Sequence, residues 1–408
     1  MGGMLYKCAF LKCCIIVRQY KRYNIIGEEM RIIMQQTITA KLQILVNPSD
    51  RQILHDTMKA YSNACNYVSD YIYKTHNLSR YSVQEDTYYN VRDSFGLRSQ
   101  MAVSCVRTVI AKYRTILENQ NEWIKPNFKI PQLDLAWNRD YSLNTKNDTF
   151  SVNTLNGRIK VKFYKGGYEN YFSSNCKFGT AKLVFKHDKF LLHIPVTYEI
   201  DKLAMSDVSN VVGVDRGVRF IATTYDSNGK TIFYDGNDIK QKRGHYKALR
   251  KQLQQVHTPS SRRRIKAIGQ RENRWMQDVN HCISKALVTS NPQGTLFVLE
   301  DLTGVRAATE KVMVKNRYVS VSWSYYDLEQ KLTYKALKNH QLVEKVNPAY
   351  TSQTCPKCGH TEKSNRDKHN HLFCCKNCGY KSNDDRIGAM NLYRMGINLL
   401  VPDAVTTE

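Results

Sequence analysis

The chain has 408 residues, of which 42% are hydrophobic and 24% are charged, and this length suits about two to four domains that each bury a core. Those proportions lie near globular averages and exclude a wholly disordered chain. Lys and Arg number 61 against 36 Asp and Glu, which gives a net charge of +25. Because such a surplus adds self-repulsion without helping the fold, it indicates a polyanionic partner, and nucleic acid fits better than a membrane surface.

The most apolar N-terminal stretch, residues 8–17, is interrupted by Lys12 and is shorter than the roughly 18–20 apolar residues that span a membrane. No small-residue cleavage site follows it, so a secretory signal is disfavoured. We therefore expect a cytoplasmic protein that has neither a membrane partner nor a small-molecule substrate. In that reducing compartment, clustered cysteines serve metal binding better than disulfides.

Residues 1–33 lack clear periodicity and are interpreted as an N-terminal extension of doubtful order before Met34. Apolar residues then alternate along 38–46, which predicts a strand with one buried face. Within 48–125 the apolar spacing becomes three and four, which predicts a helical insertion. Between about 132 and 200 the period returns to two, with hairpin turns expected at Asn156-Gly157 and at His187-Asp188. We expect these strands to pair with the first strand in one small β-domain.

Residues 240–274 contain twelve Lys or Arg against one Glu and read as two helices joined near Pro259. Such a stretch is ordinarily a solvated helical face. Here it supplies +11 of the net charge of +25, which favours contact with phosphates. The candidate phosphate-binding residues are Lys240, Lys242, Arg243, Lys247, Arg250, Lys251, Arg262, Arg263, Arg264 and Lys266.

Two Cys-x-x-Cys pairs, Cys355 with Cys358 and Cys375 with Cys378, are separated by sixteen residues. Each pair places two thiolates on one tight turn, and two such turns complete a tetrahedral sulfur shell for zinc. A site with four protein ligands is structural and not catalytic. Cys374 breaks the two-residue spacing. The remaining alternative ligands are three nearby histidines, His360, His369 and His371.

Three acidic residues stand at the ends of predicted elements. Asp215 ends an apolar strand, Glu300 ends a second, and Asp385 begins an amphipathic helix after the cysteine pairs, with Asp384 as a competing candidate. Each is weak evidence alone, because strand-end carboxylates commonly cap helices or pair with basic neighbours. Together they match a chemical need: phosphodiester hydrolysis by two divalent cations about 3.5–4 Å apart requires converging carboxylates. We therefore predict that these three residues bind Mg²⁺ and are catalytic.

These motifs resemble the transposon-encoded TnpB family, and their order is also that of the related compact type V CRISPR effectors. The resemblance covers about residues 210–395, whereas the N-terminal half is similar in layout only. Many family members have Asn where Ile387 stands, two residues after the last aspartate. The resemblance to the TnpB family is carried by five sequence motifs: Gly213-Val-Asp-Arg-Gly217, Leu299-Glu-Asp-Leu302, Tyr350-Thr-Ser-Gln-Thr-Cys-Pro-Lys-Cys-Gly359, Cys375-Lys-Asn-Cys-Gly-Tyr380 and Asn383-Asp-Asp-Arg-Ile-Gly-Ala-Met-Asn391.

The resemblance implies an α+β multidomain protein that cleaves target DNA under the direction of a guide RNA, with structural Zn²⁺ and catalytic Mg²⁺. Asp215, Glu300 and Asp385 then take the three acidic positions of a RuvC-like, RNase H-like nuclease, and the four cysteines take the zinc-ribbon positions. The implied parts are a β-barrel-like wedge domain (34–47 and 126–205) with a helical recognition insertion (48–125), the nuclease domain (206–349 and 380–400), the ribbon (350–379) and a tail (401–408).

Two other functions stay open at this point. The first is an RNA-guided DNA-binding repressor that does not cleave, which would suit a relative that has lost its acidic residues. All three acidic residues are present here. The second is a nuclease or strand transferase that assists transposition without a guide. Copurified RNA would distinguish a guided protein from this last class.

Overall fold

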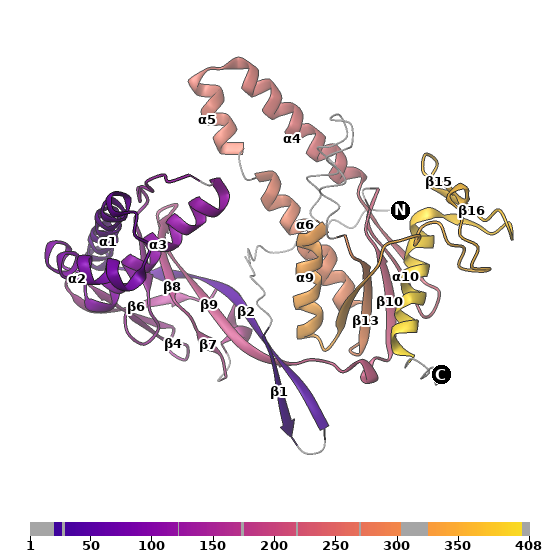
Figure 1. The fold of residues 1–408 in the computed structure, drawn as a ribbon, viewed down its shortest axis with the longest axis horizontal. Helices are drawn as coiled ribbons and strands as arrows, with labels where there is room; N and C mark the ends of the chain where they lie inside the picture. Colours follow the sequence, from indigo (N-terminus) through magenta and orange to yellow (C-terminus); the bar gives the residue numbers. More distant parts are fainter. Residues whose placement is uncertain are drawn as a thin grey trace. The chain divides into compact units, whose positions relative to one another are not determined.

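The computed structural model describes residues 20–26, 29–120, 122–172, 175–217, 219–268, 271–302 and 325–401. Within them the chain forms two compact units, one built mainly from Gln35–Glu199 and one mainly from Ile200–Glu408. Both units combine helices and strands, so the protein is of the mixed α+β class (Figure 1). Among the described residues, no helix is both long enough and apolar enough to cross a membrane.

The first unit is built on an antiparallel, barrel-like sheet in the order β3-β8-β9-β2-β6-β5-β4, in which β7 also pairs with β9. The strand β1 pairs with β2, and this hairpin, Lys21–Met34, is grouped with the second unit. The strand predicted at 38–46 starts earlier than expected, because β2 begins at Glu29. A short strand, β1, precedes it within the predicted 1–33 extension. Residues 1–19 of that extension lie outside the described part of the chain. The strand bounds are β1 (Tyr20–Ile26), β2 (Glu29–Leu45), β3 (Gln132–Leu135), β4 (Tyr141–Asn144), β5 (Thr149–Thr154), β6 (Gly157–Tyr164), β7 (Lys177–Phe178), β8 (Ala181–Lys186) and β9 (Lys189–Asp201).

Pairing along this sheet follows the predicted turns. The β8–β9 hairpin closes at the pair Lys186 and Lys189, and both residues between them have positive φ, as a tight two-residue hairpin turn requires. The β5–β6 hairpin closes at Thr154 and Gly157, one residue earlier than predicted. As expected, β2 pairs with strands from the later segment.

Three helices of the first unit occupy the segment between β2 and β3: α1 (Pro48–Thr75), α2 (Arg80–Phe95) and α3 (Ser99–Gln120). The side chain of Asn47 caps α1 by accepting the Asp50 N–H at 2.7 Å. Leu54 and Met58 of α1 are fully buried and belong to the same hydrophobic core as the sheet residue Leu42. The helices and the sheet therefore fold as one unit.

The second unit is built on a five-stranded sheet in the order β12-β11-β10-β13-β14. The strands β10, β13 and β14 run parallel, whereas β11 and β12 are antiparallel to their neighbours. The element bounds are β10 (Asn210–Asp215), β11 (Phe220–Asp226), β12 (Thr231–Asp235), α4 (Asn237–Val256), α5 (Pro259–Ile268), α6 (Arg271–Thr289), β13 (Thr295–Glu300), α9 (Tyr325–Lys338), β14 (Leu342–Val346) and α10 (Asp384–Leu400). Short 3₁₀ turns cover Glu169–Tyr171, Met205–Asp207 and Lys363–Asn365.

Helices cover both faces of this sheet. Phe297 and Leu299 of β13 point to a core that includes residues of α6 and α9, while Leu296 and Val298 point to the other face and meet Leu392 of α10. This alternation along β13 is the period of two expected of a strand buried on both sides. Figure 1 shows α10 lying along β10.

Gly213 of β10 allows α10 to pack directly against the strand. A Cβ atom at this position would lie 2.1 Å from the carbonyl oxygen of Ala389 and 2.5 Å from the backbone nitrogen of Tyr393, closer than real Cβ atoms approach. Only glycine fits so near to another backbone. The close packing brings the first turn of α10 to the end of β10.

Between β14 and α10 the chain forms a small sheet of β15 (Arg366–Asp367), β16 (Leu372–Cys374) and β17 (Lys381–Asn383) in the order β15-β16-β17. This segment also contains the two cysteine pairs. Ile387 of α10 packs in the same small core as Cys355, Phe373 and Cys375. The segment is therefore attached to the helix that follows it.

Candidate active site and metal centre

Two of the predicted acidic residues end adjacent parallel strands. Val214 of β10 is in register with Leu299 of β13, so the next residues, Asp215 and Glu300, lie at the same edge of the sheet. The carboxyl ends of parallel strands are where ligands commonly bind in α/β sheets. The sheet therefore explains how 85 residues of separation become one site.

The third predicted residue, Asp385, lies in the first turn of α10. Asn383 caps this helix by accepting the backbone N–H groups of Asp385 and Arg386, each at 3.1 Å. Asp385 is 8% exposed, and its Oδ2 is buried without a hydrogen-bond partner. A buried carboxylate oxygen without a donor is costly unless a cation or a proton satisfies it. Asp385 thus has the properties of a metal ligand.

The close packing of α10 on β10 brings Asp385 near Asp215. A Cβ atom on Gly388 of α10 would lie 2.8 Å from Asp215 Oδ2, and a Cβ atom on Gly217 would lie 3.9 Å from Asp385 Oδ1. Asp215, Glu300 and Asp385 nevertheless do not all place oxygen atoms within 4.8 Å of one another among the described residues.

Burial and mutual repulsion shape the electrostatics of this cluster. Burial raises the pKa of Asp215 well above its usual value, and the nearby charges of Glu300 and Asp385 raise it further. Burial also raises the pKa of Glu300, although the hydrogen bond from Thr351 opposes the rise. The pKa of Asp385 is raised by burial and then by Asp384. Converging carboxylates that resist ionisation form a site that a divalent cation would stabilise.

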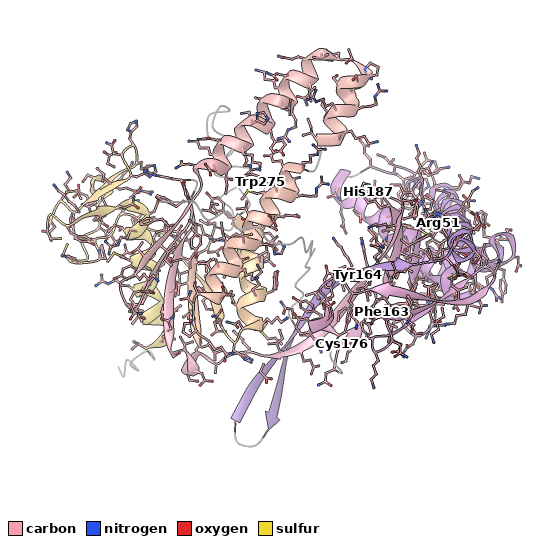
Figure 2. All side chains as sticks on the ribbon, turned by 180° about the vertical axis from the view of Figure 1, so that it is seen from behind. Arg51, Phe163, Tyr164, Cys176, His187 and Trp275 are labelled. Atoms are coloured by element: carbon pink, nitrogen blue, oxygen red, sulfur yellow. The ribbon has the colours of Figure 1, made fainter. Side chains whose placement is uncertain are left out.

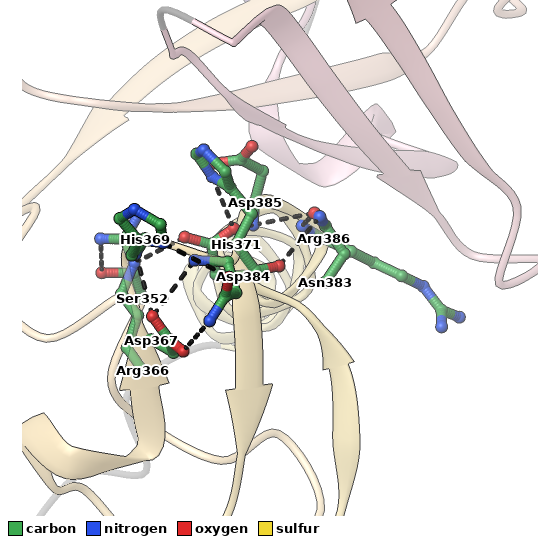
Figure 3. A network of polar contacts seen from close by, with 10 residues as sticks. Ser352, Arg366, Asp367, His369, His371, Asn383, Asp384, Asp385 and Arg386 are labelled. Carbon is green, nitrogen blue, oxygen red and sulfur yellow. Dashed lines mark hydrogen bonds and ion pairs between the residues drawn. The ribbon is translucent and has the colours of Figure 1, made fainter.

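Asp384, the competing candidate, is engaged elsewhere. It is fully buried, its Oδ2 accepts a hydrogen bond from Arg366 Nε at 2.8 Å, and its Oδ1 lies 3.4 Å from His371 Nδ1 (Figure 3). His371, Asp384 and Asp385 do offer ligand atoms within 4.8 Å of one another. Because the Arg366 guanidinium already balances the Asp384 charge, Asp384 needs a cation less than Asp385 does.

Sequence reasoning missed two residues that contact this cluster, Arg216 and Thr351, and a third, Tyr325, whose hydroxyl is influenced by the Asp215 charge. Arg216, 5% exposed, donates to the Glu300 carbonyl at 2.5 Å and to Glu329 Oε2 at 3.1 Å. Thr351 donates its hydroxyl proton to Glu300 Oε1. Burial raises the pKa of Tyr325 to about 12, with a further contribution from the Asp215 charge. Arg216 and Thr351 lie within the sequence motifs named above, so the motifs could have pointed to them. No sequence feature points to Tyr325.

The four cysteine sulfurs form a compact cluster. The Sγ atoms of Cys355 and Cys378 are 3.6 Å apart, those of Cys358 and Cys375 are 3.5 Å apart, and all four lie within 4.8 Å of one another. A tetrahedral zinc site with Zn–S bonds of about 2.3 Å requires sulfurs about 3.8 Å apart. The donor set and its spacing therefore fit structural zinc, as the sequence predicts.

The two cysteine turns share one geometry. The N–H of Gly359 donates to the Cys355 carbonyl and the N–H of Gly379 donates to the Cys375 carbonyl, both at 2.9 Å. Both glycines have positive φ, +75° and +70°, which favours glycine at that position. Cys374 lies in β16 and is not in the sulfur cluster.

The three alternative histidine ligands lie outside the cluster of four sulfurs. His371 is near Asp384, and His360 Nε2 is 3.0 Å from Glu362 Oε2. His369 is exposed, and its ring nitrogen Nδ1 is 3.4 Å from Asn370 Oδ1. The four-cysteine ligand set is thus the one that the geometry supports.

The predicted phosphate-binding residues lie on α4 and α5 and divide into two groups. Arg243 is 4% exposed, and its Nε pairs with Glu272 Oε1 at 3.1 Å. Arg250 also pairs with Glu272. The ion pairs with Glu272 leave Arg243 buried and Arg250 partly buried, so these two side chains are less available to a phosphate than the exposed ones. Phosphate contact by this group of residues stays a prediction. The exposed members are Lys240, Lys242, Lys247, Lys251, Arg262, Arg263, Arg264 and Lys266.

A groove of about 440 Å³ lies between α4 and α5 and is lined in part by Lys242, Tyr246 and Arg264. The Lys242 ammonium lies 4.4 Å from the ring centre of Trp275, which Figure 2 labels on α6. In the first unit, a second groove of about 790 Å³ is lined in part by Arg107 and Lys129. Both grooves contain cations beside apolar residues, and the second also contains Asp134.

Two protein-family models match parts of the chain. Residues 193–304 match a protein-family model described as "Probable transposase", and residues 325–392 match one described as "Cas12f1-like, TNB domain". Together these matches include the two strand-end carboxylates, the cysteine cluster and the start of α10.

Two curated relatives and one solved structure resemble the chain. A Cas12f1 endodeoxyribonuclease of Syntrophomonas palmitatica is 27% identical over 65% of this chain, and the chain spans only 55% of that protein. A structure described as a Cas12f1-sgRNA-target DNA complex is similar in fold, with a TM-score of 0.57 at 15% identity over 86% of this chain and 83% of that one. A TnpB-like protein of Methanocaldococcus jannaschii is 32% identical over 58% of this chain and 86% of that protein. With this match the chain belongs to the TnpB family.

Proposed function

We propose that the protein is an RNA-guided DNA endonuclease that hydrolyses target DNA at Asp215, Glu300 and Asp385. The observation that carries the proposal is that Asp215 and Glu300 end adjacent parallel strands, and that the charges of Glu300 and Asp385 both act on the buried Asp215 carboxyl. Carboxylate oxygens are the ligands that hard divalent cations prefer, and carboxyl groups with perturbed pKa values cluster at functional sites. The β12-β11-β10-β13-β14 sheet with helices on both faces is consistent with a RuvC-like, RNase H-like domain.

The residues of the chain would hold the catalytic ions and keep them in place. Asp215 and Glu300 extend from a rigid sheet edge, and Asp385 from a capped helix, so little rearrangement is needed when cations bind. Bound there, Mg²⁺ would supply the chemistry of activating water and stabilising the leaving 3′-oxygen. Arg216, which donates to the carbonyl of Glu300, keeps the end of β13 in position.

The proposed partners are a guide RNA and a target DNA. Supporting this proposal, the relative from Syntrophomonas carries the name Cas12f1, and the solved Cas12f1 structure of similar fold is a complex with an sgRNA and target DNA. The net charge of +25 and the exposed cations of α4 and α5 suit phosphate backbones. Base pairing with the guide would then supply the sequence specificity.

The proposal is tested by purifying the protein from its native host and sequencing the RNA that copurifies. We expect one discrete RNA species, and we expect the complex to cut DNA that carries the matching sequence when Mg²⁺ is present. Bound RNA without cutting would indicate an RNA-guided repressor. Cutting that needs no RNA would indicate a guide-independent transposition nuclease, and either result would overturn the proposal.

The basic helices give a second test. Replacing Arg262, Arg263 and Arg264 together with Ala is expected to weaken RNA binding and to flatten its salt dependence by about three units of logarithmic slope, about one for each lost phosphate contact. Filter binding between 50 and 300 mM salt, roughly the range in which such contacts are screened, measures the slope. Replacement of the same residues with Lys keeps the charge and should keep the slope. An unchanged slope in the Ala variant would remove these residues from the interface.

A further inference from the structure

A short loop between β14 and the first cysteine touches the proposed catalytic site. Thr351 in this loop is 5% exposed, and its hydroxyl donates to Glu300 Oε1. The Thr351 hydroxyl oxygen also lies 3.1 Å from the carbonyl oxygen of Pro348. A hydroxyl has one proton to donate, and an ionised carboxylate is a stronger acceptor than a carbonyl. Thr351 therefore restrains one oxygen of Glu300 whenever Glu300 is charged.

The position of Thr351 is itself fixed from α10. The side-chain nitrogen of Asn391, which is 7% exposed, donates to the Thr351 carbonyl at 2.6 Å and to the Thr354 carbonyl at 2.8 Å. Asn391 and Asp385 belong to the same helix. The helix that carries the third carboxylate thus also holds the loop that restrains the second.

We propose that Thr351 is a positioning residue that orients Glu300 for cation binding, and that Asn391 acts through Thr351. This inference rests on the proposed function, because it assumes that Glu300 binds a catalytic cation. Groups that hydrogen-bond a metal ligand fix its orientation, and losing one typically costs about 10–100-fold in metal affinity or activity. Thr351 does not need to touch the substrate for this role.

The test replaces Thr351 with Val, which keeps the shape and removes the hydroxyl. We expect the Mg²⁺ concentration for half-maximal cleavage to rise about tenfold or more, with a smaller change in the rate at saturating Mg²⁺. Binding of Mn²⁺ to the complex, followed by electron paramagnetic resonance, should weaken by a similar factor. Thr351→Ser restores a hydroxyl and should recover both values.

The matched control is Thr354→Val in the same loop. The Thr354 hydroxyl contacts the Tyr350 carbonyl and the Thr361 hydroxyl, at 3.0 and 2.9 Å, and no carboxylate. Its Mg²⁺ dependence should equal that of the unmodified protein. Asn391→Ala should reproduce the effect of Thr351→Val, and the double variant should show less than the sum of the two effects. Additive effects would contradict a shared route.

Failure of this inference is distinguishable from failure of the proposed function. If Glu300→Gln abolishes cleavage while Thr351→Val leaves both the Mg²⁺ dependence and Mn²⁺ binding unchanged, Thr351 has no positioning role. If Glu300→Gln itself cleaves normally, the proposed site is wrong. If Thr351→Val lowers the melting temperature and loses activity without any change in Mn²⁺ binding, the residue is structural only.

Discussion

Replacing Asp215 with Asn is expected to abolish DNA cleavage and, at the same time, to raise the melting temperature. We expect the cleavage rate to fall at least a thousandfold, which corresponds to about 4 kcal/mol of transition-state stabilisation. Asn has nearly the same shape as Asp but cannot supply the negative charge that holds a cation. Single-turnover cleavage of DNA by the RNA complex in Mg²⁺ measures the loss.

The expected gain in stability follows from the raised pKa of Asp215, which burial causes first and the charges of Glu300 and Asp385 increase. A carboxyl whose folded-state pKa lies above its unfolded value makes folding less favourable once it is ionised. The neutral amide removes that cost at neutral pH. The gain should appear in buffer without added Mg²⁺ and should shrink when Mg²⁺ is added, because the cation stabilises the unmodified protein.

The neighbouring aspartate supplies the control for this stability effect. Asp384 is paired with Arg366, so Asp384→Asn leaves a guanidinium without its counter-charge and should lower the melting temperature. A higher melting temperature for Asp215→Asn and a lower one for Asp384→Asn would distinguish a carboxylate repelled by its neighbours from one paired with a cation. Normal cleavage by Asp215→Asn would show that the chemistry occurs elsewhere, and a lower melting temperature would contradict the proposed repulsion.

Replacing Cys375 with Ser is expected to release the zinc and to unfold the segment around it. Cys375 is 2% exposed and belongs to the four-sulfur cluster. Structural zinc supplies about 10–16 kcal/mol of apparent binding free energy in small zinc-binding domains, so losing a ligand removes most of what holds such a segment. Atomic emission measurement should give one zinc per chain before the substitution and nearly none after it.

The adjacent residue gives a control of the same chemistry. Cys374→Ser changes a thiol that is not in the cluster and should keep the zinc. Loss of zinc in Cys375→Ser should also weaken cleavage. Thr351, which contacts Glu300, and Arg366, which contacts Asp384, lie close to the cysteine turns in the chain, so unfolding of the turns would disturb both contacts. Full zinc content in Cys375→Ser, or zinc loss in Cys374→Ser, would show that the ligand set is wrong.

Local patterns were enough for the features that depend on neighbours in the chain. The zinc ligands follow from two short spacings, since each turn is closed by hydrogen bonds within five residues. The helices of the first unit and the hairpin at Lys186–Lys189 follow from periodicity and turn residues in the same way. The start of β2 at Glu29 could not be predicted from the sequence, because the first residues of this strand lack the clear alternation of apolar and polar residues that marks a buried face.

By itself, the sequence determined which residues are able to carry the chemistry: three acidic residues at the ends of elements, four cysteines in two pairs, and a surplus of positive charge. The tertiary structure alone decided which of them are paired, buried or left without a partner. It paired Arg243 with Glu272 in the core, engaged Asp384 with Arg366 and left Asp385 with an unpartnered oxygen. It also placed Thr351 against Glu300. These distinctions depend on burial and on partners far away in the chain, and neither is encoded in the spacing of adjacent residues.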